Sequence, residues 1–359
     1  MTAVRDVTLV IPARDAMRTI ERCLDAAIAV RDRTGSRLAR ILLVDDGSRD
    51  GTAAAAAARG IEVLSGSGSG PGAARNLGWR AATTPLVWFV DSDCVCEPES
   101  LERLLPHLLD PQVAGVSGTY SIAADASLLE RLIHEEIMVR HARMPEETDF
   151  LATYDVVYRR GVLASLRGFD ERYLKGQDAE LAFRVLEAGH RLRFERGSRV
   201  MHFHADRLSR YLKVQRQQGY WRVALHLAHP GRGSNRYSGT LDHLQPFVAA
   251  AVGPAVIAAI VMTIWFDAVR GSANDGVAWL SPLTGWTLPG VLVAMLLLMQ
   301  LPMALAMVRR AGLAMVWFVP LGAIRACWRA VGLVQGVADR MLGRGAISAR
   351  AIAHAGGID

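Results

Sequence analysis

The stretch from Pro85 to Cys96 constrains the fold of this chain more than any other part of the sequence. Residues 86–90, Leu-Val-Trp-Phe-Val, are apolar at successive positions, which is typical of a central parallel strand with both faces covered. Asp91 and Asp93 follow where the strand should leave the sheet, the place where open α/β sheets bind ligands. Alternate residues of an extended backbone point to the same side, so both carboxylates could face one hard cation, or a ribose and a cation. A solvated acidic turn is the simpler alternative.

Strands and helices are expected to alternate through the first half of the chain. We expect strands at residues 7–12, 40–44, 61–64, 86–90, 113–122 and 151–159, and helices at 16–30, 52–59, 98–109, 126–144 and from residue 73. This order predicts an α/β fold with a mostly parallel sheet and right-handed crossovers. Loops that follow parallel strands meet at one rim, which would gather five distant carboxylates: Asp15, Asp45, Asp46, Asp91 and Asp93. A nucleotide and its metal need such a gathering.

The loop from Ser65 to Gly72 alternates glycine and serine before a predicted helix. It could be a flexible connection, as such compositions often are. Alternatively, its backbone amides and Arg75 could lie against a phosphate or a base, although the spacing of a P-loop and the dinucleotide fingerprint are both absent.

Acidic residues open the helix predicted to end at Gly189. Asp178 and Glu180 occupy its first turn, and carboxylates there are usually structural, because the helix dipole and capping favour them. If it faces the pocket, Asp178 could also act as a general base, since it would be held rigidly within reach of an attacking hydroxyl.

Histidines cluster in two segments. Residues 199–204 should place His202 and His204 on the same side of an extended segment, where either could complete the coordination of a cation or touch a diphosphate. The helix expected at 126–144 carries His134-Glu135-Glu136, but the spacing of an HExxH metal site is absent, so we interpret these residues as a charged face.

The formal net charge of +6 suits an anionic membrane surface or phosphorylated substrates. Nucleic acid is disfavoured, because the chain has no zinc-finger pattern, no aromatic RNA-binding signature and no basic recognition helix. The helix expected at 207–227 concentrates basic and aromatic residues, and suits contact with anionic phospholipid or a lipid diphosphate. The four cysteines are unevenly spaced, and we expect no signal sequence, so the bulk of the chain should lie in the reducing cytosol. Cys94 and Cys96 are then expected to be ordinary buried thiols.

Two uncharged stretches, Phe247–Phe266 and Leu288–Val308, are long enough to cross a hydrocarbon core of about 30 Å. The loop between them holds only Asp267, Arg270 and Asp275, whereas Arg309 and Arg310 follow the second stretch. The positive-inside rule then places the N-terminal domain in the cytosol, with the chain in the inner or plasma membrane.

A third apolar stretch, Leu313–Val337, is interrupted by Arg325 and Arg329. Crossing would export three more arginines, so we expect an interfacial or re-entrant helix, with a complete third span as the alternative. The predicted domains are therefore a cytosolic domain at 1–240 and a membrane region at 241–359.

Five motifs together resemble family 2 glycosyltransferases with the GT-A fold, over roughly residues 5–225. They are VIPARD, VDDGSRDGT, GPGAARN, FVDSD and GFDERYLKGQDAELAFRVLEAGHRL. The segment KVQRQQGYWRVALHLAHPG, followed by apolar stretches, is similar in a looser way to the membrane-bound glycosyltransferases of the succinoglycan exopolysaccharide type.

The resemblance implies inversion at the anomeric carbon of a sugar by one in-line displacement, with a nucleoside diphosphate of the UDP or GDP type leaving. It assigns the proton-accepting role to Asp178 and the binding of Mg²⁺ or Mn²⁺ to Asp93. His202, a possible cation ligand from its position in residues 199–204, is a further metal candidate. The candidates for nucleotide-sugar binding are Pro12, Ala13, Asp15, Asp45, Arg75, Asn76, Asp91 and Ser92. Weaker candidates for the acceptor or the diphosphate are Gln177, His204, Arg216, Tyr220 and Trp221.

The chain departs from the family pattern at two places. Gln177-Asp178 stands where the family commonly has Glu-Asp, so the base is kept but its acidic neighbour is lost. The Q-x-x-R-W motif of processive synthases is not matched by Gln217 to Trp221, and two or three spans leave little material for a pore. We therefore expect addition of one sugar to a lipid-linked saccharide. Transfer directly to polyprenyl phosphate and a catalytically silent membrane scaffold are the alternatives.

Overall fold

The computed structural model describes residues 5–33, 35–230, 237–270 and 282–344. The chain packs as two compact units. The first contains the residues up to Asp206 together with Ala224–Tyr237, and the second contains Arg207–Val223 and Ser238–Leu342. Each unit is described by itself below.

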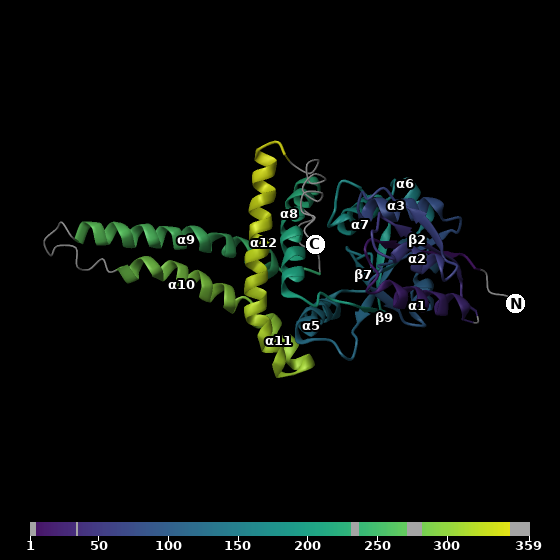
Figure 1. Ribbon diagram of the computed structural model, residues 1–359, viewed down its shortest axis with the longest axis horizontal. Coiled ribbons are helices and arrows are strands. Elements are labelled where there is room, and N and C mark those ends of the chain that lie inside the picture. Colours follow the sequence, from purple (N-terminus) through teal and green to yellow (C-terminus); the bar gives the residue numbers. More distant parts are fainter. Residues whose placement is uncertain (1–4, 34, 231–236, 271–281, 345–359) are drawn as a thin grey trace. The chain divides into compact units, whose positions relative to one another are not determined.

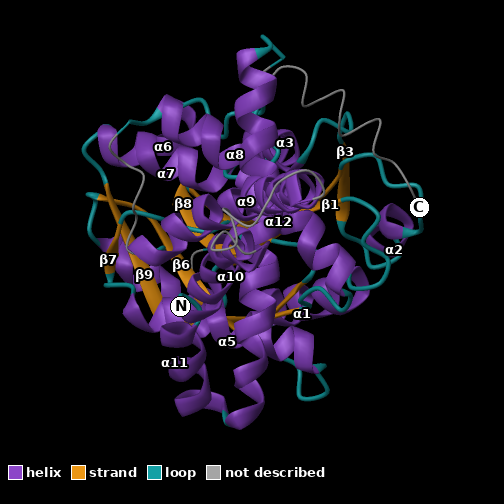
Figure 2. Cartoon of the chain, turned by 90° about the vertical axis from the view of Figure 1, so that its left-hand side faces the viewer, coloured by secondary structure: helices purple, strands orange, loops and turns teal. Residues whose placement is uncertain are grey.

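The first unit is built on one sheet with the strand order β3-β2-β1-β4-β8-β6-β9-β5, and β7 pairs with β9. Figure 2 shows strands of this sheet in orange. The strands are β1 (Val7–Ala13), β2 (Leu38–Asp45), β3 (Glu62–Ser65), β4 (Leu86–Val90), β5 (Cys94–Cys96), β6 (Val113–Ser121), β7 (Glu147–Thr148), β8 (Asp155–Arg159) and β9 (Arg191–His202). Strands β1 to β4 are parallel, as is the β6–β9 pair, whereas β5, β7 and β8 pair antiparallel with their neighbours. The predicted mostly parallel α/β sheet is confirmed.

Helices cover both faces of this sheet. One face packs against α1 (Ile20–Asp32), α2 (Thr52–Ala57), α4 (Ser100–Leu104) and the 3₁₀ helix η1 (Leu105–Leu109). The other packs against α3 (Pro71–Ala81), α6 (Arg160–Ser165) and α7 (Gln177–Glu187). All five residues of β4 are buried between these layers, as the apolar run at residues 86–90 predicted.

Helix α5 (Leu128–Arg143) differs from its sequence expectation. A charged surface face was predicted there, but His134, Glu136, Arg140 and His141 are each only about 5% exposed. Arg140 donates to the Glu136 carboxylate four residues earlier, so this ion pair satisfies two buried charges within one helix. The expectation of a solvated face is therefore wrong, because the pattern of charges along a helix does not reveal which side packs against the sheet.

The second unit is helical, and in Figure 1 its helices α9 and α10 run side by side. It contains the first part of α8 (Leu208–Ala228), then α9 (Thr240–Arg270), α10 (Pro282–Leu298), α11 (Leu301–Ala311), η2 (Leu313–Trp317) and α12 (Phe318–Met341). Among the residues that the structure describes, three helical segments could each cross a membrane by length and composition: Thr240–Phe266, Gly285–Ala311 and Leu313–Met341. The predicted loop around Asp275 lies outside the described residues.

Helices α8 and α12 meet almost backbone to backbone. A Cβ atom at Gly219 of α8 would collide with the carbonyl of Arg329, and one at Gly332 of α12 would collide with the carbonyl of Arg216. Small residues allow this approach, as they do between membrane helices. Arg329 donates to the side chains of Gln215 and Gln218 on α8. One of the two arginines that interrupt the third apolar stretch therefore has hydrogen-bond partners on a neighbouring helix.

Asp155 at the start of β8 is a fully buried carboxyl group in the middle of the sheet. It accepts hydrogen bonds from Trp88 Nε1 and from Ser198 Oγ, each at 2.8 Å. Burial raises the pKa of Asp155 to about 6. Because this folded-state pKa lies above that of an unfolded chain, the group supports folding below about pH 4 and loses that contribution as the pH rises through about 6.

The first prediction concerns Asp155→Asn, which removes the charge but can keep both hydrogen bonds through its amide oxygen and nitrogen. The stability of the variant relative to the unaltered chain should rise between pH 4 and pH 7 by about 2 kcal/mol. Thermal melting at several pH values measures this difference. Asp125→Asn, at an exposed loop residue, is the control and should show no such trend. A difference that stays constant from pH 4 to pH 7 would contradict the assignment.

Candidate active site

The carboxyl ends of β1 and β2 lie next to each other, because Pro12 pairs with Val44 and Ala13 with Asp45. Asp15, just beyond β1, adopts a left-handed backbone with φ of 48°. Its amide donates to Ser48 Oγ at 2.9 Å, and its Oδ1 accepts from the Arg49 amide at 2.7 Å. The two loops are therefore fastened to each other at the rim where the nucleotide was predicted to bind.

The Gly/Ser loop folds back onto the Asp45-Asp46 end of β2. Gly66 N donates to the Asp45 carbonyl at 2.8 Å, and Gly70 N donates to Asp46 Oδ2 at 2.7 Å. Gly70 has φ of 104°, a region that side chains rarely adopt, and it leads directly into α3. Burial raises the pKa of the Asp46 carboxyl group. Asp46 therefore serves as a buried anchor for this loop.

Arg75 on α3 reaches the first aspartate of the D-x-D turn. Its side chain is 4% exposed, and its Nη2 donates to Asp91 Oδ1 at 2.5 Å. The Nε and Nη1 atoms of this guanidinium are buried without a hydrogen-bond partner. Its carbon lies 5.8 Å from the centre of the Phe169 ring. A buried cation with spare donors suits a diphosphate or sugar hydroxyls.

Asn76, the next residue, has its side chain fully engaged with protein groups. Its Nδ2 donates to the Phe169 carbonyl and to Glu171, and its Oδ1 accepts from the Phe169 amide and from Trp79 Nε1. The structure therefore uses Asn76 to tie α3 to the segment before α7, while its predicted contact with a nucleotide sugar stays a prediction.

The second aspartate of the turn faces a histidine. Asp93 Oδ2 lies 3.4 Å from His202 Nε2, at the end of β9, where His202 pairs with Cys94 of β5. One carboxylate oxygen of Asp93, the Cys94 sulfur and one ring nitrogen of His202 all lie within 4.8 Å of one another. Burial raises the pKa of the Cys94 thiol, so this sulfur stays protonated and is a poor ligand. The carboxylate and imidazole that remain fit a Mg²⁺ or Mn²⁺ ion.

Charges around Asp93 support its ionised form. Burial opposes ionisation, but His202 and Lys175 outweigh it and hold the pKa of the Asp93 carboxyl group below its ordinary value. Burial likewise opposes charging of the His202 ring, and Asp93 outweighs it, so the pKa of His202 lies above its ordinary value. Sequence analysis did not identify Lys175, because a lysine before a helix carries no distinguishing signal.

Asp178 is the second residue of α7 and is half-buried. Its Oδ1 accepts from the amide of Ala179 at 2.9 Å. Burial raises the pKa of the Asp178 carboxyl group, Arg75 opposes this rise, and Asp91 adds to it. The charge of Asp91 therefore acts on the residue predicted as the base, although the two lie 87 positions apart in the sequence.

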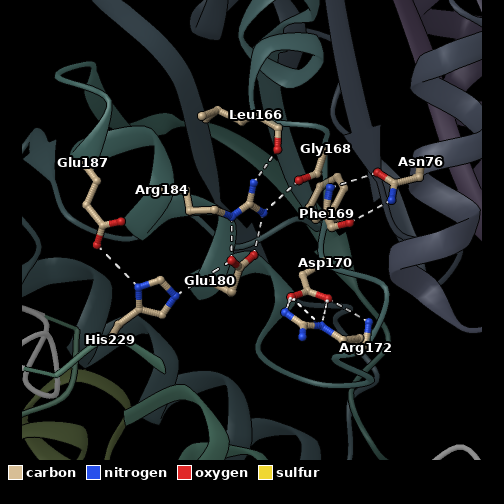
Figure 3. Close-up of polar contacts among 10 residues, drawn as sticks. All are labelled: Asn76, Leu166, Gly168, Phe169, Asp170, Arg172, Glu180, Arg184, Glu187 and His229. Carbon is tan, nitrogen blue, oxygen red and sulfur yellow. Dashed lines mark hydrogen bonds and ion pairs between the residues drawn. The ribbon is translucent and has the colours of Figure 1, made fainter. Parts of the chain in front are cut away.

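Arg184 holds α7 in place, as Figure 3 shows. Its guanidinium donates to the carbonyls of Leu166 and Gly168 at 2.7 and 2.8 Å, and to both oxygens of Glu180. Since Asn76 grips Phe169 in the same segment, α3 and α7 are joined through residues 166–169. Arg75 and Asp178 thus stand on two helices that are fixed to one segment.

Behind His202 lies a group of rings that sequence analysis did not connect. His204, 2% exposed, lies between His202 and His134 of α5. Burial, together with the neighbouring rings of His202 and His134, lowers the pKa of His204 to about 2. Tyr120 of β6 packs against both His202 and His204. Only the pairing of β6 with β9 and the packing of α5 bring these residues together.

The remaining candidates occupy different places. Gln177 is buried at the start of α7, and its Oε1 has no hydrogen-bond partner. Arg216, Tyr220 and Trp221 belong to α8 in the second unit. Arg216 donates there to Gln335 Oε1 at 2.7 Å, and Trp221 is 5% exposed. Ser92 lies within the D-x-D turn, and its carbonyl accepts from Thr19 Oγ1 at 2.9 Å.

A sheet of this strand order, with a D-x-D turn after its central strand and acidic groups at the same rim, has the GT-A fold. Residues 8–167 match the model of the family described as Glycosyl transferase family 2, so the chain contains a domain of that family.

Two curated proteins are similar to this chain in sequence. A pre-mycofactocin glycosyltransferase of Mycobacterium tuberculosis is 32% identical over 271 residues, which cover 72% of this chain and 53% of that protein. The succinoglycan biosynthesis protein ExoO of Rhizobium meliloti is 28% identical over 233 residues, which cover 59% of this chain and 64% of that protein. This chain thus spans little more than half of the first of these relatives.

Among solved structures, the mannosyltransferase PcManGT from Pyrobaculum calidifontis, in complex with GDP-Man and Mn²⁺, aligns with a TM-score of 0.56 and 17% identity. The alignment covers 94% of this chain and 89% of that one. At this identity the likeness establishes the fold.

The second prediction separates the two aspartates of the turn. Asp91→Asn should lower the free energy of unfolding by roughly 1–3 kcal/mol, because it leaves the buried guanidinium of Arg75 without its carboxylate. Asp93→Asn should change it by less than about 1 kcal/mol, because the Asp93 side chain is 46% exposed. Chemical denaturation of both variants measures the difference. Equal losses would contradict a structural role for the Arg75–Asp91 pair.

Proposed function

We propose that this chain is an inverting, divalent-metal-dependent glycosyltransferase that moves one sugar from a UDP or GDP sugar to a membrane lipid-linked saccharide. The observation that carries this proposal is the geometry around the D-x-D turn: Arg75 binds Asp91 at 2.5 Å and Asp93 faces His202 at 3.4 Å. The helix of Asp178 is tied to that of Arg75 through residues 166–169. A candidate base, a candidate metal ligand and a buried cation are thereby associated with one rim of the sheet.

Asp178 is the proposed base. A raised carboxyl pKa brings its proton affinity closer to working pH, which improves general base catalysis. It takes the proton of an acceptor hydroxyl as that oxygen bonds to the anomeric carbon from the face opposite the leaving group. The bond from this carbon to the nucleoside diphosphate breaks in the same displacement, and the configuration is inverted.

Asp93 and His202 are the proposed protein ligands of the cation. A bound Mg²⁺ or Mn²⁺ offsets charge on the diphosphate as it leaves. Arg75 adds a buried cation whose Nε and Nη1 lack protein partners. Asp15, just beyond β1, is proposed to line the nucleotide pocket, and Asp45, the last residue of β2, to contact the base or the ribose.

The membrane side of the proposal is supported by helices of the second unit and by relatives. Three segments are apolar and long enough to span a bilayer. Two relatives are an O-antigen chain rhamnosyltransferase of Salmonella anatum and the succinoglycan biosynthesis protein, whose names point to polysaccharide assembly. We propose that residues 1–240 lie on the cytosolic side and 241–359 in the membrane, with the helix that begins near Leu313 in the interface.

The third prediction tests the base. Asp178→Asn should lower turnover at least about 100-fold, because the amide cannot accept the acceptor's proton, while nucleotide affinity stays within a few-fold. Asp25→Asn is the matched control, since Asp25 is an exposed carboxylate of α1, and it should retain full turnover. Sugar transfer and nucleotide binding are measured separately. Unchanged turnover in Asp178→Asn would reject the assignment.

The fourth prediction concerns metal, donor and acceptor. Release of UDP or GDP from a panel of donor sugars should stop on chelation and return with Mn²⁺ or Mg²⁺. The product should carry the sugar with inverted configuration on a lipid-linked saccharide. Transfer to polyprenyl phosphate alone would replace the acceptor in our proposal. Chelator-resistant turnover would exclude the metal, and donor binding without any turnover would favour a silent scaffold.

A further inference from the structure

Three histidines form a continuous line behind the proposed metal position. His202 Nδ1 lies 2.8 Å from His204 Nδ1, and His204 Nε2 lies 3.3 Å from His134 Nδ1. The other nitrogen of the first ring, His202 Nε2, faces Asp93 Oδ2 at 3.4 Å. The line therefore runs from the D-x-D turn into the buried interior, where His134 and His204 are at most 5% exposed.

The backbone around His202 is already fixed by the sheet. His202 pairs with Cys94, and the amide of the next residue, Phe203, donates to the carbonyl of Asp93 at 3.0 Å. What the backbone leaves undetermined is the imidazole itself: the rotation of its ring and which nitrogen carries the proton. These two properties decide whether Nε2 offers a lone pair to a cation.

Proton positions along the line follow from the short contact between the two Nδ1 atoms. Two nitrogens 2.8 Å apart must share one proton, because two lone pairs or two N–H groups would repel each other. A ring that ligates a cation through Nε2 carries its proton on Nδ1. His202 Nδ1 then donates to His204 Nδ1, the His204 proton lies on Nε2, and that N–H donates to His134 Nδ1.

We propose that His204 is a positioning residue for the metal site. It accepts the proton of His202 Nδ1, and this hydrogen bond aims the free Nε2 lone pair of His202 at the cation beside Asp93. Tyr120 supports the arrangement, since its ring centre lies 4.7 Å from that of His202 and 5.7 Å from that of His204. The inference rests on the proposed metal-dependent function.

The fifth prediction measures Mn²⁺ affinity directly, by electron paramagnetic resonance of free Mn²⁺ with the full chain in detergent and UDP or GDP present. His204→Phe keeps a ring of similar size but offers no acceptor, and it should weaken Mn²⁺ binding about 10- to 100-fold. His204→Asn places an amide oxygen near the position of Nδ1, and it should recover most of the affinity. Nucleotide binding in chelator should be the same in both variants.

His190→Phe is the matched control, because it makes the same chemical change in the turn between α7 and β9, outside the line of histidines. It should bind Mn²⁺ like the unaltered chain. If His204→Phe also binds Mn²⁺ within threefold of the unaltered chain, or if His204→Asn is as weak as His204→Phe, the positioning role is overturned. An unaltered chain that binds no Mn²⁺ would instead overturn the metal-dependent function, and the inference with it.

A measurement on the unaltered chain covers the case in which His204→Phe fails to fold. Nitrogen NMR of the chain labelled with ¹⁵N-histidine, with Mg²⁺ and nucleotide, distinguishes protonated from bare ring nitrogens. The proposal requires one histidine that keeps its proton on Nδ1 and whose Nε2 resonance shifts when Mg²⁺ is added. A histidine that responds through Nδ1, or no response from any histidine, would overturn it.

Discussion

The ion pair between Arg75 and Asp91 is the interaction on which the rest of the site depends. A guanidinium that is 4% exposed requires a carboxylate partner, and the D-x-D turn supplies one at 2.5 Å. The pair therefore fixes the turn after β4 against α3. With Asp91 committed to this contact, Asp93 is left half-exposed beside His202, and the two aspartates of one short motif have different physical roles.

The helix that carries the candidate base, α7, is fixed to α3 through a shared segment. Asn76 follows Arg75 on α3 and grips the backbone of Phe169 through both its amide and its carbonyl. Arg184 of α7 binds the carbonyls of Leu166 and Gly168 in the same segment. These hydrogen bonds from Asn76 and Arg184 to backbone atoms limit the movement of α3 and α7 relative to each other. Asp178, the candidate base on α7, and Arg75 on α3 therefore stand on helices that are tied to one segment.

Within the second unit, charge is handled in a different way. Arg325 of α12 is 1% exposed, donates to Gln245 Oε1 at 3.3 Å and lies 5.1 Å from the centre of the Phe318 ring. Gly219 and Gly332 let α8 and α12 approach so closely that Arg329 can reach glutamines of α8. Arginines that interrupt an apolar stretch are thus partnered by neighbouring helices, which makes their presence compatible with a membrane environment.

The sequence by itself determined the alternation of strands and helices, the burial of β4, the acidic rim and the family, because these depend on local periodicity and on motif order. Tertiary structure alone decided that β8 runs antiparallel between β4 and β6, that the charged residues of α5 are buried, and that His134 meets His204. The physical reason is that local patterns record which side chains prefer burial. Strand pairing and helix packing between distant segments decide which of those side chains meet.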